Sequence, residues 1–320
     1  MLMDKIKIIV PERMKGDRLD VAITKMLPDL SRSKIISAIK DGDILIHEKK
    51  FKAKDKAIGD EIVTLKLQQK DAVRWVPEKI PLDIVYEDDD IIILNKPSGL
   101  VTHPGPGNWT GTLANALLYH NDCLSKLDRS GIVHRLDKNT SGLMVVAKNS
   151  KSQKNLVDQL QTHSVEREYS SIVYGKMISG GTVDEPIGRH PKDRVKQAVI
   201  SNGKKAITHY RVIEKFDNHT HVKALLETGR THQIRVHLSH IGYPLIGDVL
   251  YGGRIKFPKK ASGELKDVLK SLKRQALHAK KLTLIHPGTG KSMTWKIELP
   301  EDMKQLLDVL NSSDSLMNIN

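Results

Sequence analysis

The segment HRLDKNTSG holds the side chains best suited to chemistry in this sequence. An apolar pair leads into it and the strand-like run GLMVVA follows it, so we expect Asp137 on a loop between two ordered elements. Hydroxyls at Thr140 and Ser141 can tie the loop down through hydrogen bonds to its backbone, and Gly142 permits a tight turn. A carboxylate held in this way can act as a nucleophile or a base. An ion pair with the nearby Arg135 is the plainer alternative.

Two further segments carry polar side chains of interest. In ETGRTHQIRVHLSH a strand ends at Glu227, the turn TG follows, and Arg230 and Thr231 open a helix with Thr231 as its N-cap. In REYSSIVYGK a strand presents Tyr169 beside Arg167. Taken alone, Tyr169 would be an ordinary cross-strand aromatic residue.

The sequence gives no indication of a metal or cofactor. His232, His237 and His240 do not have the i, i+4 spacing of a zinc-binding helix, and no Glu lies between them. Cys123 is the single cysteine, which excludes an intramolecular disulfide, and no recognisable His and Asn accompany it as in a thiol enzyme. We therefore expect chemistry that uses protein side chains alone.

Two motifs resemble nucleotide-binding sequences and are set aside. PGTGKS would be a phosphate-binding loop only with a glycine at the position of Ile285, and the strand-like run MTWKIEL follows where a helix is required. HRLDKNTSG differs from the protein-kinase catalytic loop, in which Asp follows Arg directly.

The net charge of +14 and the pI near 9.6 favour a polyanionic partner. Between Arg254 and Lys281, ten basic and two acidic residues give a local net charge of +8, which predicts salt-dependent RNA contact, a solvated basic face being the alternative. No apolar run approaches the roughly 20 residues that span a bilayer, and the N-terminus carries no signal-peptide pattern. We expect a cytoplasmic monomer without membrane contact.

Residues 17–66 predict a small helix-helix-hairpin unit. Asp17 can cap a helix that ends near Leu27, and Ser31 can cap a second helix that ends at Gly42. The strands DILIH and EIVTLKL follow. The predicted organisation is an RNA-binding domain, a linker and a catalytic domain, at residues 1–67, 68–81 and 82–320.

The catalytic domain is expected to be α+β, with a mixed, mainly antiparallel sheet and flanking helices, because strand-like runs dominate and helical segments interrupt them. The predicted strands are DIVYED, DIIILNKP, GLMVVAKN, REYSSIVYGK, ITHYRVIEKF, HVKALLETG, KKLTLIHP and MTWKIELP. The predicted helices lie at about 112–119, 151–162, 231–241 and 301–310.

The segments HRLDKNTSGLMVVAKN, REYSSIVYGK, ETGRTHQIRVHL and RQALHAKKLTLIHP occur in the order and approximate spacing of the RluA-type pseudouridine synthases, which residues from about 80 to 300 strongly resemble. NKPSGLVTHPGPGNWTGTLANAL looks like the first conserved block of that family. PIGRHPKDRVKQAV followed by GKKAITHYRV resembles a subtype that modifies large-subunit ribosomal RNA. The N-terminal unit, with RLD, SRS and GD, resembles the RNA-binding domain named for ribosomal protein S four. It departs from that pattern at IHEKK, where a Val-Asn-Gly turn is usual.

The resemblance implies an isomerase that flips a uridine out of its helix, breaks the glycosidic bond and rejoins the uracil through carbon, with no cofactor. Asp137 corresponds to the catalytic aspartate, and Arg135 to the arginine that fills the vacated stack. Tyr169 resembles the ring that packs on the target base, and Arg230 resembles the basic partner of the aspartate. The implied substrate is a stem-loop of large-subunit ribosomal RNA near the subunit interface, in pre-ribosomal particles.

The sequence does not separate three chemical routes, namely attack of Asp137 on the base, attack on the sugar carbon, and proton abstraction that gives a glycal. A rival from another class is a non-catalytic RNA-binding or ribosome-assembly factor. Pure binding gives no reason for an Asp inside a basic pocket, since its carboxylate would repel phosphates.

Overall fold

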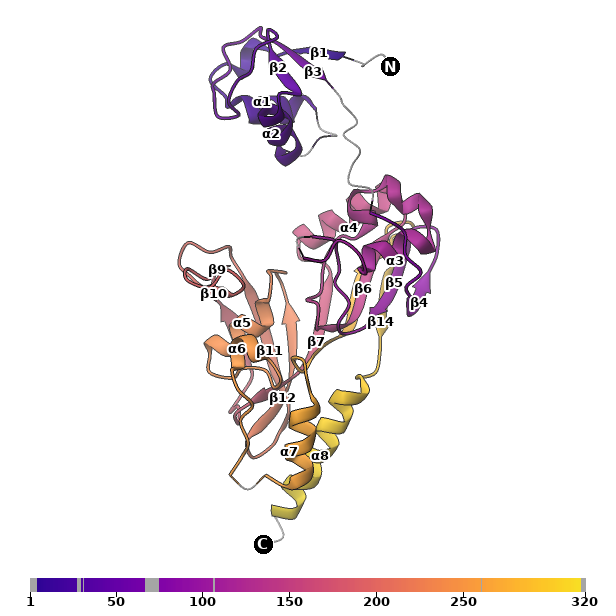
Figure 1. Cartoon of the computed structure of the whole chain (residues 1–320), viewed down its shortest axis with the longest axis vertical. Helices are drawn as coiled ribbons and strands as arrows, with labels where there is room; N and C mark the ends of the chain where they lie inside the picture. Colours follow the sequence, from indigo (N-terminus) through magenta and orange to yellow (C-terminus); the bar gives the residue numbers. More distant parts are fainter. Residues whose placement is uncertain are drawn as a thin grey trace. The chain divides into compact units, whose positions relative to one another are not determined.

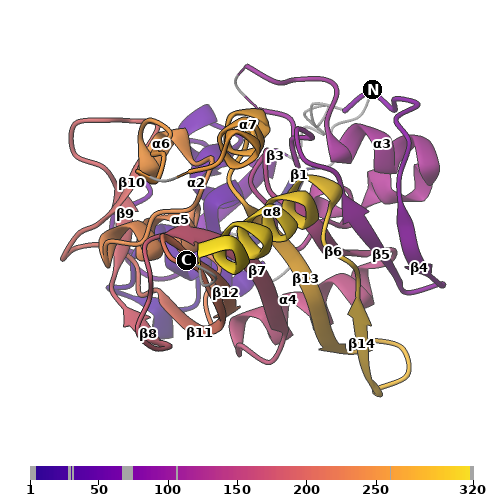
Figure 2. The same cartoon turned by 90° about the horizontal axis from the view of Figure 1, so that it is seen from below.

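The structure is a computed structural model that describes residues 5–27, 30, 32–66, 75–105, 107–259 and 261–317. The chain divides into two compact units, Met1–Arg74 and Trp75–Asn320, and their elements are labelled in Figures 1 and 2. None of the helices in the described part of the chain has the length and apolar character that a bilayer crossing requires.

The first unit packs two helices on a three-stranded antiparallel sheet of order β1-β3-β2. The outer strand β1, which the sequence analysis does not anticipate, pairs with β3 along its whole length. The core is aliphatic and includes Ile23, Ile35 and Val63. The elements are β1 (Lys5–Ile9), η1 (Glu12–Met14), α1 (Leu19–Met26), α2 (Arg32–Asp41), β2 (Ile44–Ile46) and β3 (Ile62–Lys66).

The helix starts of the first unit differ from those expected. Arg18, with an extended backbone, is the N-cap of α1, and no side chain caps it. Asp17, the expected cap, forms an ion pair with Lys25 at 3.0 Å instead. Ser31, the cap expected for α2, lies outside the described residues. After β2, His47 and Glu48 both have positive φ, as the two central residues of a type I′ turn require. These two positions are more often occupied by Asn and Gly.

A buried carboxylate joins the two helices of the first unit. Asp20 is 0% exposed and accepts hydrogen bonds from Arg18 at 3.0 and 3.1 Å and from Arg32 at 2.7 and 3.1 Å. The bonds from Arg18 contribute most to lowering the pKa of this carboxyl. Both oxygens of Asp20 therefore accept hydrogen bonds within the fold.

The second unit is built on a nine-stranded sheet of order β4-β5-β6-β13-β7-β12-β11-β8, with β14 paired to β13. All pairings are antiparallel except that of β6 with β13, so the expected mixed, mainly antiparallel sheet is confirmed. The two short strands β9 and β10 pair separately, and the sequence analysis does not include them or β8. The strands are β4 (Ile84–Glu87), β5 (Ile91–Lys96), β6 (Ser141–Ala147), β7 (Glu166–Tyr174), β8 (Gly181–Asp184), β9 (Ile187–Arg189), β10 (Gln197–Val199), β11 (Ile207–Lys215), β12 (His219–Leu226), β13 (Leu277–Ile285) and β14 (Ser292–Lys296).

Gly142 is required at the start of β6 by the close approach of β13 rather than by a tight turn. Its φ is +118°, and a Cβ at this position would lie 2.3 Å from the carbonyl oxygen of Ala279. The strand that follows the HRLD segment is thereby seated against the centre of the sheet.

Helices cover both faces of the sheet. Tyr169 and Val173 of β7 face a core shared with α3 and α5, while Ile172 faces a core shared with α7 and α8. Figure 2 shows α8 beside α7, running across the sheet. The helices are α3 (Leu113–His120), η2 (Asp122–Lys126), η3 (Asp128–Gly131), α4 (Ser150–Gln161), α5 (Gln233–His240), α6 (Val249–Gly252), α7 (Gly263–Ser271) and α8 (Glu301–Met317).

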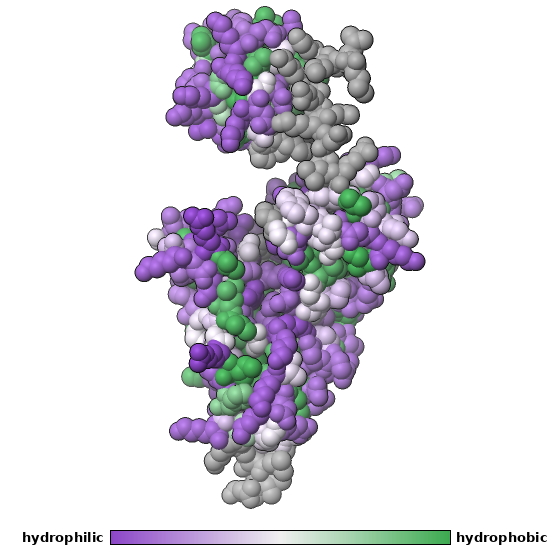
Figure 3. Space-filling view, in the orientation of Figure 1, coloured by the Kyte–Doolittle hydropathy of each residue, from purple (hydrophilic) through white to green (hydrophobic). Residues whose placement is uncertain are grey.

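The basic stretch Arg254–Lys281 is partly structural. Its helix α7, which the sequence analysis does not predict, buries Leu265 and Leu269 against α8. Arg274 forms a two-bonded ion pair with Asp302 at 2.6 and 2.7 Å. Much of the molecule's visible surface is hydrophilic, with smaller hydrophobic patches on the second unit (Figure 3). At least one of the basic residues that give the local charge of +8, Arg274, is therefore used in the fold rather than on a free surface.

The described end of the predicted linker is packed on the second unit. The side-chain amide of Asn115 in α3 donates to the carbonyl of Val76, and the backbone N–H of Glu78 donates to the carbonyl of Asn115. Trp75 packs against the same core as α3. Residues 68–74 of the predicted linker lie outside the described residues.

Candidate active site

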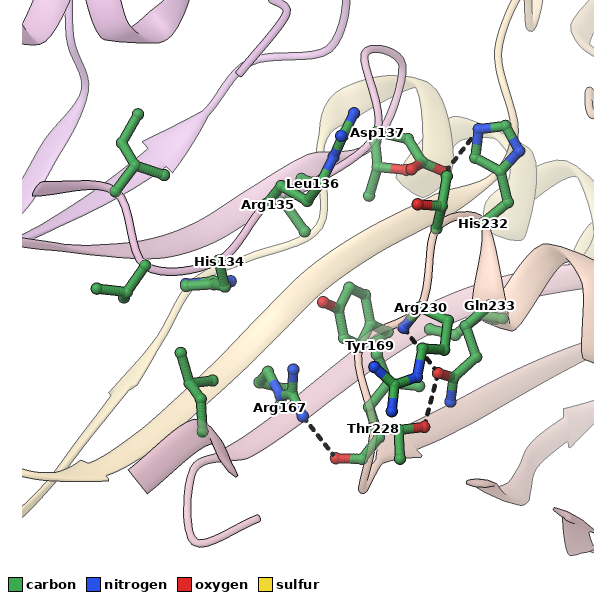
Figure 4. Close-up of a pocket in the computed structure, with 18 of the residues that line it drawn as sticks. His134, Arg135, Leu136, Asp137, Arg167, Tyr169, Thr228, Arg230, His232 and Gln233 are labelled. Carbon is green, nitrogen blue, oxygen red and sulfur yellow. Dashed lines mark hydrogen bonds and ion pairs between the residues drawn. The ribbon is translucent and has the colours of Figure 1, made fainter. Parts of the chain in front are cut away.

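A pocket of about 580 Å³ opens in the second unit on the face of the sheet that carries Tyr169 (Figure 4). Its walls come from the HRLD segment before β6, the first half of β7, the end of α4 and the turn that leads into α5. Four side chains singled out in the sequence line it, namely Arg135, Asp137, Tyr169 and Arg230. The fold thus brings together segments that are almost 100 residues apart.

The carboxylate of Asp137 is held by one strong partner and is otherwise open. Its Oδ2 accepts a hydrogen bond from Nη1 of Arg235 at 3.0 Å, and Nε2 of His232 lies 3.9 Å away. Its Oδ1 accepts no hydrogen bond from the residues that the structure describes, and the side chain is 15% exposed. One oxygen is therefore available to a molecule in the pocket.

The backbone of the Asp137 loop is fixed by side chains from other elements. The ammonium of Lys96, at the end of β5, donates to the carbonyl of Lys138 at 3.1 Å and to two further carbonyls. Thr102 donates to the carbonyl of Leu136 at 2.9 Å. Burial lowers the pKa of Lys96 to about 8, although Asp137 acts in the opposite direction. These bonds position the reactive carboxylate from behind.

The hydroxyls expected to hold the loop are used differently. Thr140 accepts a hydrogen bond from the side-chain amide of Gln275 at 3.0 Å, and Ser141 bonds to Nδ1 of His278 at 2.9 Å. Both partners lie at the start of β13 or just before it. The hydroxyls therefore anchor the loop to the neighbouring strand rather than to its own backbone.

Arg235, which the sequence analysis does not single out, is the cation that pairs with Asp137. It lies in the first turn of α5 and forms a bidentate pair with Asp248 at 2.7 and 3.0 Å, so its third nitrogen points to Asp137. Its guanidinium also stacks 4.9 Å from the ring centroid of Tyr251. Burial alone would lower its pKa, but Asp248 and Asp137 outweigh burial and raise the pKa above its usual value. This guanidinium favours the ionised form of Asp137.

The pairing of Arg230 with Asp137 that the family resemblance implied was wrong. Nε of Arg230 donates to the carbonyl of Lys205 at 3.0 Å, and the residue is exposed at the pocket edge. The cause is a local turn: His232 has φ of +58° and is the N-cap, so α5 begins at Gln233. Arg230 therefore precedes the helix and points away from Asp137. Thr231 is not the N-cap of α5.

Gln233 stabilises this turn from inside. Its Oε1 accepts from the backbone N–H of Arg230 at 3.0 Å and from the hydroxyl of Thr228 at 2.7 Å. Its amide donates to the carbonyl of Ile207 at 2.9 Å. The side-chain oxygen and nitrogen of Gln233 are therefore both hydrogen-bonded within the fold.

Tyr169 and Arg135 lie on two sides of the pocket. Tyr169 is 6% exposed on β7, and its hydroxyl has no hydrogen-bond partner among the described residues. Burial raises the pKa of this phenol, which therefore stays neutral. Arg135 is exposed and forms neither a hydrogen bond nor an ion pair with any residue that the structure describes. The local ion pair between Arg135 and Asp137, which was the alternative interpretation of this segment, does not form among the described residues.

Three imidazoles of the pocket lining, those of His103, His134 and His232, are neutral around pH 7. Burial lowers the pKa of His134 to about 3, and burial with help from Arg129 lowers the pKa of His103 to about 4. Burial also lowers the pKa of His232. Nε2 of His134 accepts the backbone N–H of Val145 at 3.0 Å, so this ring supports the loop. The positive charge of the pocket therefore comes from arginines.

Among the described residues, five arginines but a single carboxylate, that of Asp137, line the pocket. An arrangement of this kind attracts polyanions while it keeps one acid ionised.

His237, one of the three histidines considered as metal ligands in the sequence, lies in α5. Both of its ring nitrogens are hydrogen-bonded, to Thr208 and to the carbonyl of Glu185. A group of possible metal ligands at Asp88, Asp90 and His286 lies outside the pocket lining.

Comparison with known proteins gives concordant results. The family model described as RNA pseudouridylate synthase matches residues 90–240. The "Ribosomal large subunit pseudouridine synthase D" of Yersinia pestis is 50% identical over 309 residues, which are 96% of this chain and 95% of that protein. The protein of the same name from Pseudomonas aeruginosa is 50% identical over 301 residues, 94% of each chain. The structure of "Human RNA Pseudouridylate Synthase Domain Containing 4" matches with a TM-score of 0.55 and 26% identity, covering 72% of this chain and 93% of that one.

Proposed function

This chain belongs to the RNA pseudouridylate synthase family, and from that premise we propose that it isomerises uridines of large-subunit ribosomal RNA to pseudouridine with Asp137 as its essential carboxylate. The observation that carries the proposal is the half-open carboxylate of Asp137, paired with Arg235 at 3.0 Å inside an arginine-lined pocket. The reaction is an intramolecular transfer, so nothing but the RNA has to enter.

The target uridine is flipped out of its helix before it reacts. A glycosidic bond inside a stacked helix is out of reach of a side chain, and extrusion costs a few kcal/mol of unstacking. Tyr169 packs on the extruded base, and such stacking contributes roughly 1–3 kcal/mol. Arg135, exposed and unpaired among the described residues, fills the vacated position in the RNA.

One carboxylate is sufficient for this reaction. A hydrolytic glycosidase needs two carboxyl groups and an admitted water, because a water must be activated against the sugar. Here the uracil itself is turned and rejoined through carbon, so Asp137 is the one carboxylate that the reaction requires and no water has to be activated. Arg230 contacts the RNA from the pocket edge.

The first unit is a second RNA-binding site, of the type named for ribosomal protein S four. The RLD and SRS segments support this assignment, because Arg18 and Arg32, both partly exposed, form hydrogen bonds with the buried Asp20. We place the reaction in the cytoplasm, on a stem-loop near the subunit interface in pre-ribosomal particles, with the protein acting as a monomer. A purely structural assembly role has no observation that favours it over catalysis.

The test is a modification assay with the purified protein. Transcripts of large-subunit and small-subunit ribosomal RNA are incubated separately with it, digested to nucleosides and analysed for pseudouridine by chromatography with mass spectrometry. We expect pseudouridine in the large-subunit transcript alone. Equal product in both transcripts would contradict the substrate assignment, and product in neither would contradict the activity on naked RNA and require the same assay on pre-ribosomal particles.

A further inference from the structure

Arg167 is a buried cation that no carboxylate neutralises within the described residues. It is 7% exposed, yet its Nη2 reaches only the backbone carbonyls of Glu227 at 3.0 Å and Leu226 at 3.4 Å. Its Nε is buried and has no hydrogen-bond partner among the residues that the structure describes. A buried charge is costly to a fold unless it is paired, so a residue of this kind points to a partner that arrives from outside.

Arg235 gives the contrast within the same pocket. It is equally buried at 7%, but it forms hydrogen bonds with the carboxylates of Asp248 and Asp137. The fold therefore can supply acids to a buried arginine in this region, and it supplies none to Arg167.

The position of Arg167 puts its guanidinium across Tyr169 from the catalytic acid. Residues 167 and 169 of β7 are two apart and lie on the same face of the strand, both lining the pocket. Figure 4 shows Tyr169 between Asp137 and Arg167. Gly229 lies against the guanidinium, since a Cβ there would be 2.8 Å from Nη1 of Arg167. A side chain at position 229 would displace Arg167.

The reaction creates negative charge on the base. When the bond between the sugar and the ring nitrogen breaks, its electron pair stays on the uracil and spreads to the ring oxygens. Asp137 either bonds to the sugar carbon or removes a sugar proton. If Asp137 attacks the base instead, the charge again falls on a ring oxygen. The electron pair then forms the new carbon–carbon bond. Asp137 leaves the atom to which it had bonded, or returns the sugar proton that it had removed. The ring nitrogen gains a proton and the reacting carbon loses one, so no other reactant is needed.

We propose that Arg167 is a catalytic residue that stabilises the negative charge of the uracil while it is detached from the sugar. The inference rests on the proposed function. A base that stacks on Tyr169 with its sugar at Asp137 directs its far edge along the strand, toward Arg167. Preorganised donors aimed at charge that develops during a reaction act most strongly where water is excluded, and both Arg167 and Tyr169 are buried.

Arg167→Gln tests the proposal, because glutamine keeps hydrogen-bond donors and loses the charge. The measurement is the rate of pseudouridine formation in a single turnover at saturating RNA, together with the Kd for RNA at several salt concentrations. We expect the rate to fall about 100-fold, as for removal of an oxyanion donor. The Kd should change less than about threefold, and the slope of log Kd against log salt should stay at the wild-type value.

Two matched variants complete the experiment. Lys223→Gln on the adjacent strand β12 removes one positive charge outside the pocket lining and should keep the wild-type rate. Arg167→Lys keeps the charge, and a rate between those of the wild type and Arg167→Gln supports the proposal even if the glutamine variant is unstable. A lysine variant that melts like the wild type but is as slow as Arg167→Gln would argue against a charge effect.

Two outcomes overturn the proposal. One is an unchanged rate at saturating RNA for Arg167→Gln. The other is a loss confined to affinity with a salt slope smaller by about 0.7–0.9, which identifies Arg167 as a phosphate contact. Failure of the proposed function is distinct from both, because the wild-type protein would then give no pseudouridine at all.

Discussion

Each unit of this protein contains an aspartate paired with arginine, and the two aspartates are held in opposite ways. Asp20 in the first unit is 0% exposed and receives four hydrogen bonds from two arginines. Asp137 in the second unit is 15% exposed and receives one, from an arginine that is already bound to Asp248. The same kind of pair is closed in one unit and open in the other.

The difference separates a structural acid from a chemical one. A fully buried carboxylate whose two oxygens both accept hydrogen bonds within the fold contributes to stability and is not available to a ligand. A carboxylate with one oxygen free, beside a guanidinium that keeps it ionised, can attack or remove a proton. Saturation of hydrogen bonds, rather than the presence of an Asp–Arg pair, therefore identifies the reactive residue.

The largest effect that follows from this comparison concerns Asp137→Asn. The variant should lose at least about 10³-fold in pseudouridine formation, because a neutral amide is neither nucleophile nor base. It should bind RNA as the wild type does and melt at a similar temperature, since Arg235 keeps its pair with Asp248. The assay combines product analysis with RNA binding and thermal unfolding. Undiminished product would remove Asp137 from the mechanism.

Arg235→Gln should lower both the stability of the second unit and the rate of reaction. It leaves the buried carboxylate of Asp248 without its cation, which we expect to cost about 3 kcal/mol of unfolding free energy. It also removes the partner of Asp137, so the rate at saturating RNA should fall. The matched control is Arg230→Gln, the same substitution five residues earlier in the same motif, and it should weaken RNA binding while the rate at saturating RNA persists. Equal rate losses in the two variants would contradict the assignment of Arg235.

Acid should weaken the second unit before the first. Burial lowers the pKa of His219 and of His278 to about 4, so between pH 6.5 and 4 the unfolded chain binds protons that the folded chain does not. Stability must then fall as pH falls, by about 2 kcal/mol at pH 5 for a single such histidine. The lowered pKa of Asp20 adds stability that is lost only at still lower pH. Urea unfolding followed by tryptophan fluorescence reports the second unit, where all three tryptophans lie, and equal stability at pH 7 and pH 5 would disprove the effect.

Asp20→Asn gives the smallest expected effect. Loss of the charged partner of two arginines should destabilise the first unit by about 1–2 kcal/mol. Hydrogen exchange of the amides of α1 and α2 measures this directly. The variant should bind RNA less tightly and keep its rate at saturating RNA, because the chemistry resides in the other unit. A slower saturated rate would mean that Asp20 is more than a structural acid.

The sequence predicts the elements of the pocket better than their contacts. The order of the motifs and the alternation of side chains predict Asp137, Tyr169 and the strands around them. The pocket lining contains every predicted site residue. Arg235 is missed because Arg230 and Arg235 share one motif, and the left-handed backbone of His232 decides which one enters the helix. Glycine indicates a positive φ far more strongly than His does, so the sequence around His232 does not show where this turn lies.

Long-range packing accounts for the other differences. Thr140 and Ser141 bond to residues more than 130 positions away, which local sequence cannot reveal. The helix α7 is difficult to predict because lysines lie between and beside its apolar positions Leu265, Val268 and Leu269. The strands β8, β9 and β10 are three or four residues long and fall below the length at which alternation is recognisable.

The central claim is tested most directly in cells. Pseudouridines in large-subunit ribosomal RNA are mapped at nucleotide resolution in a strain that lacks this protein, and again after it is supplied with the wild-type chain or with Asp137→Asn expressed at the same level. We predict that specific pseudouridines disappear on deletion, return with the wild-type chain and stay absent with Asp137→Asn. Their return with the asparagine variant, or an unchanged map after deletion, would contradict the account.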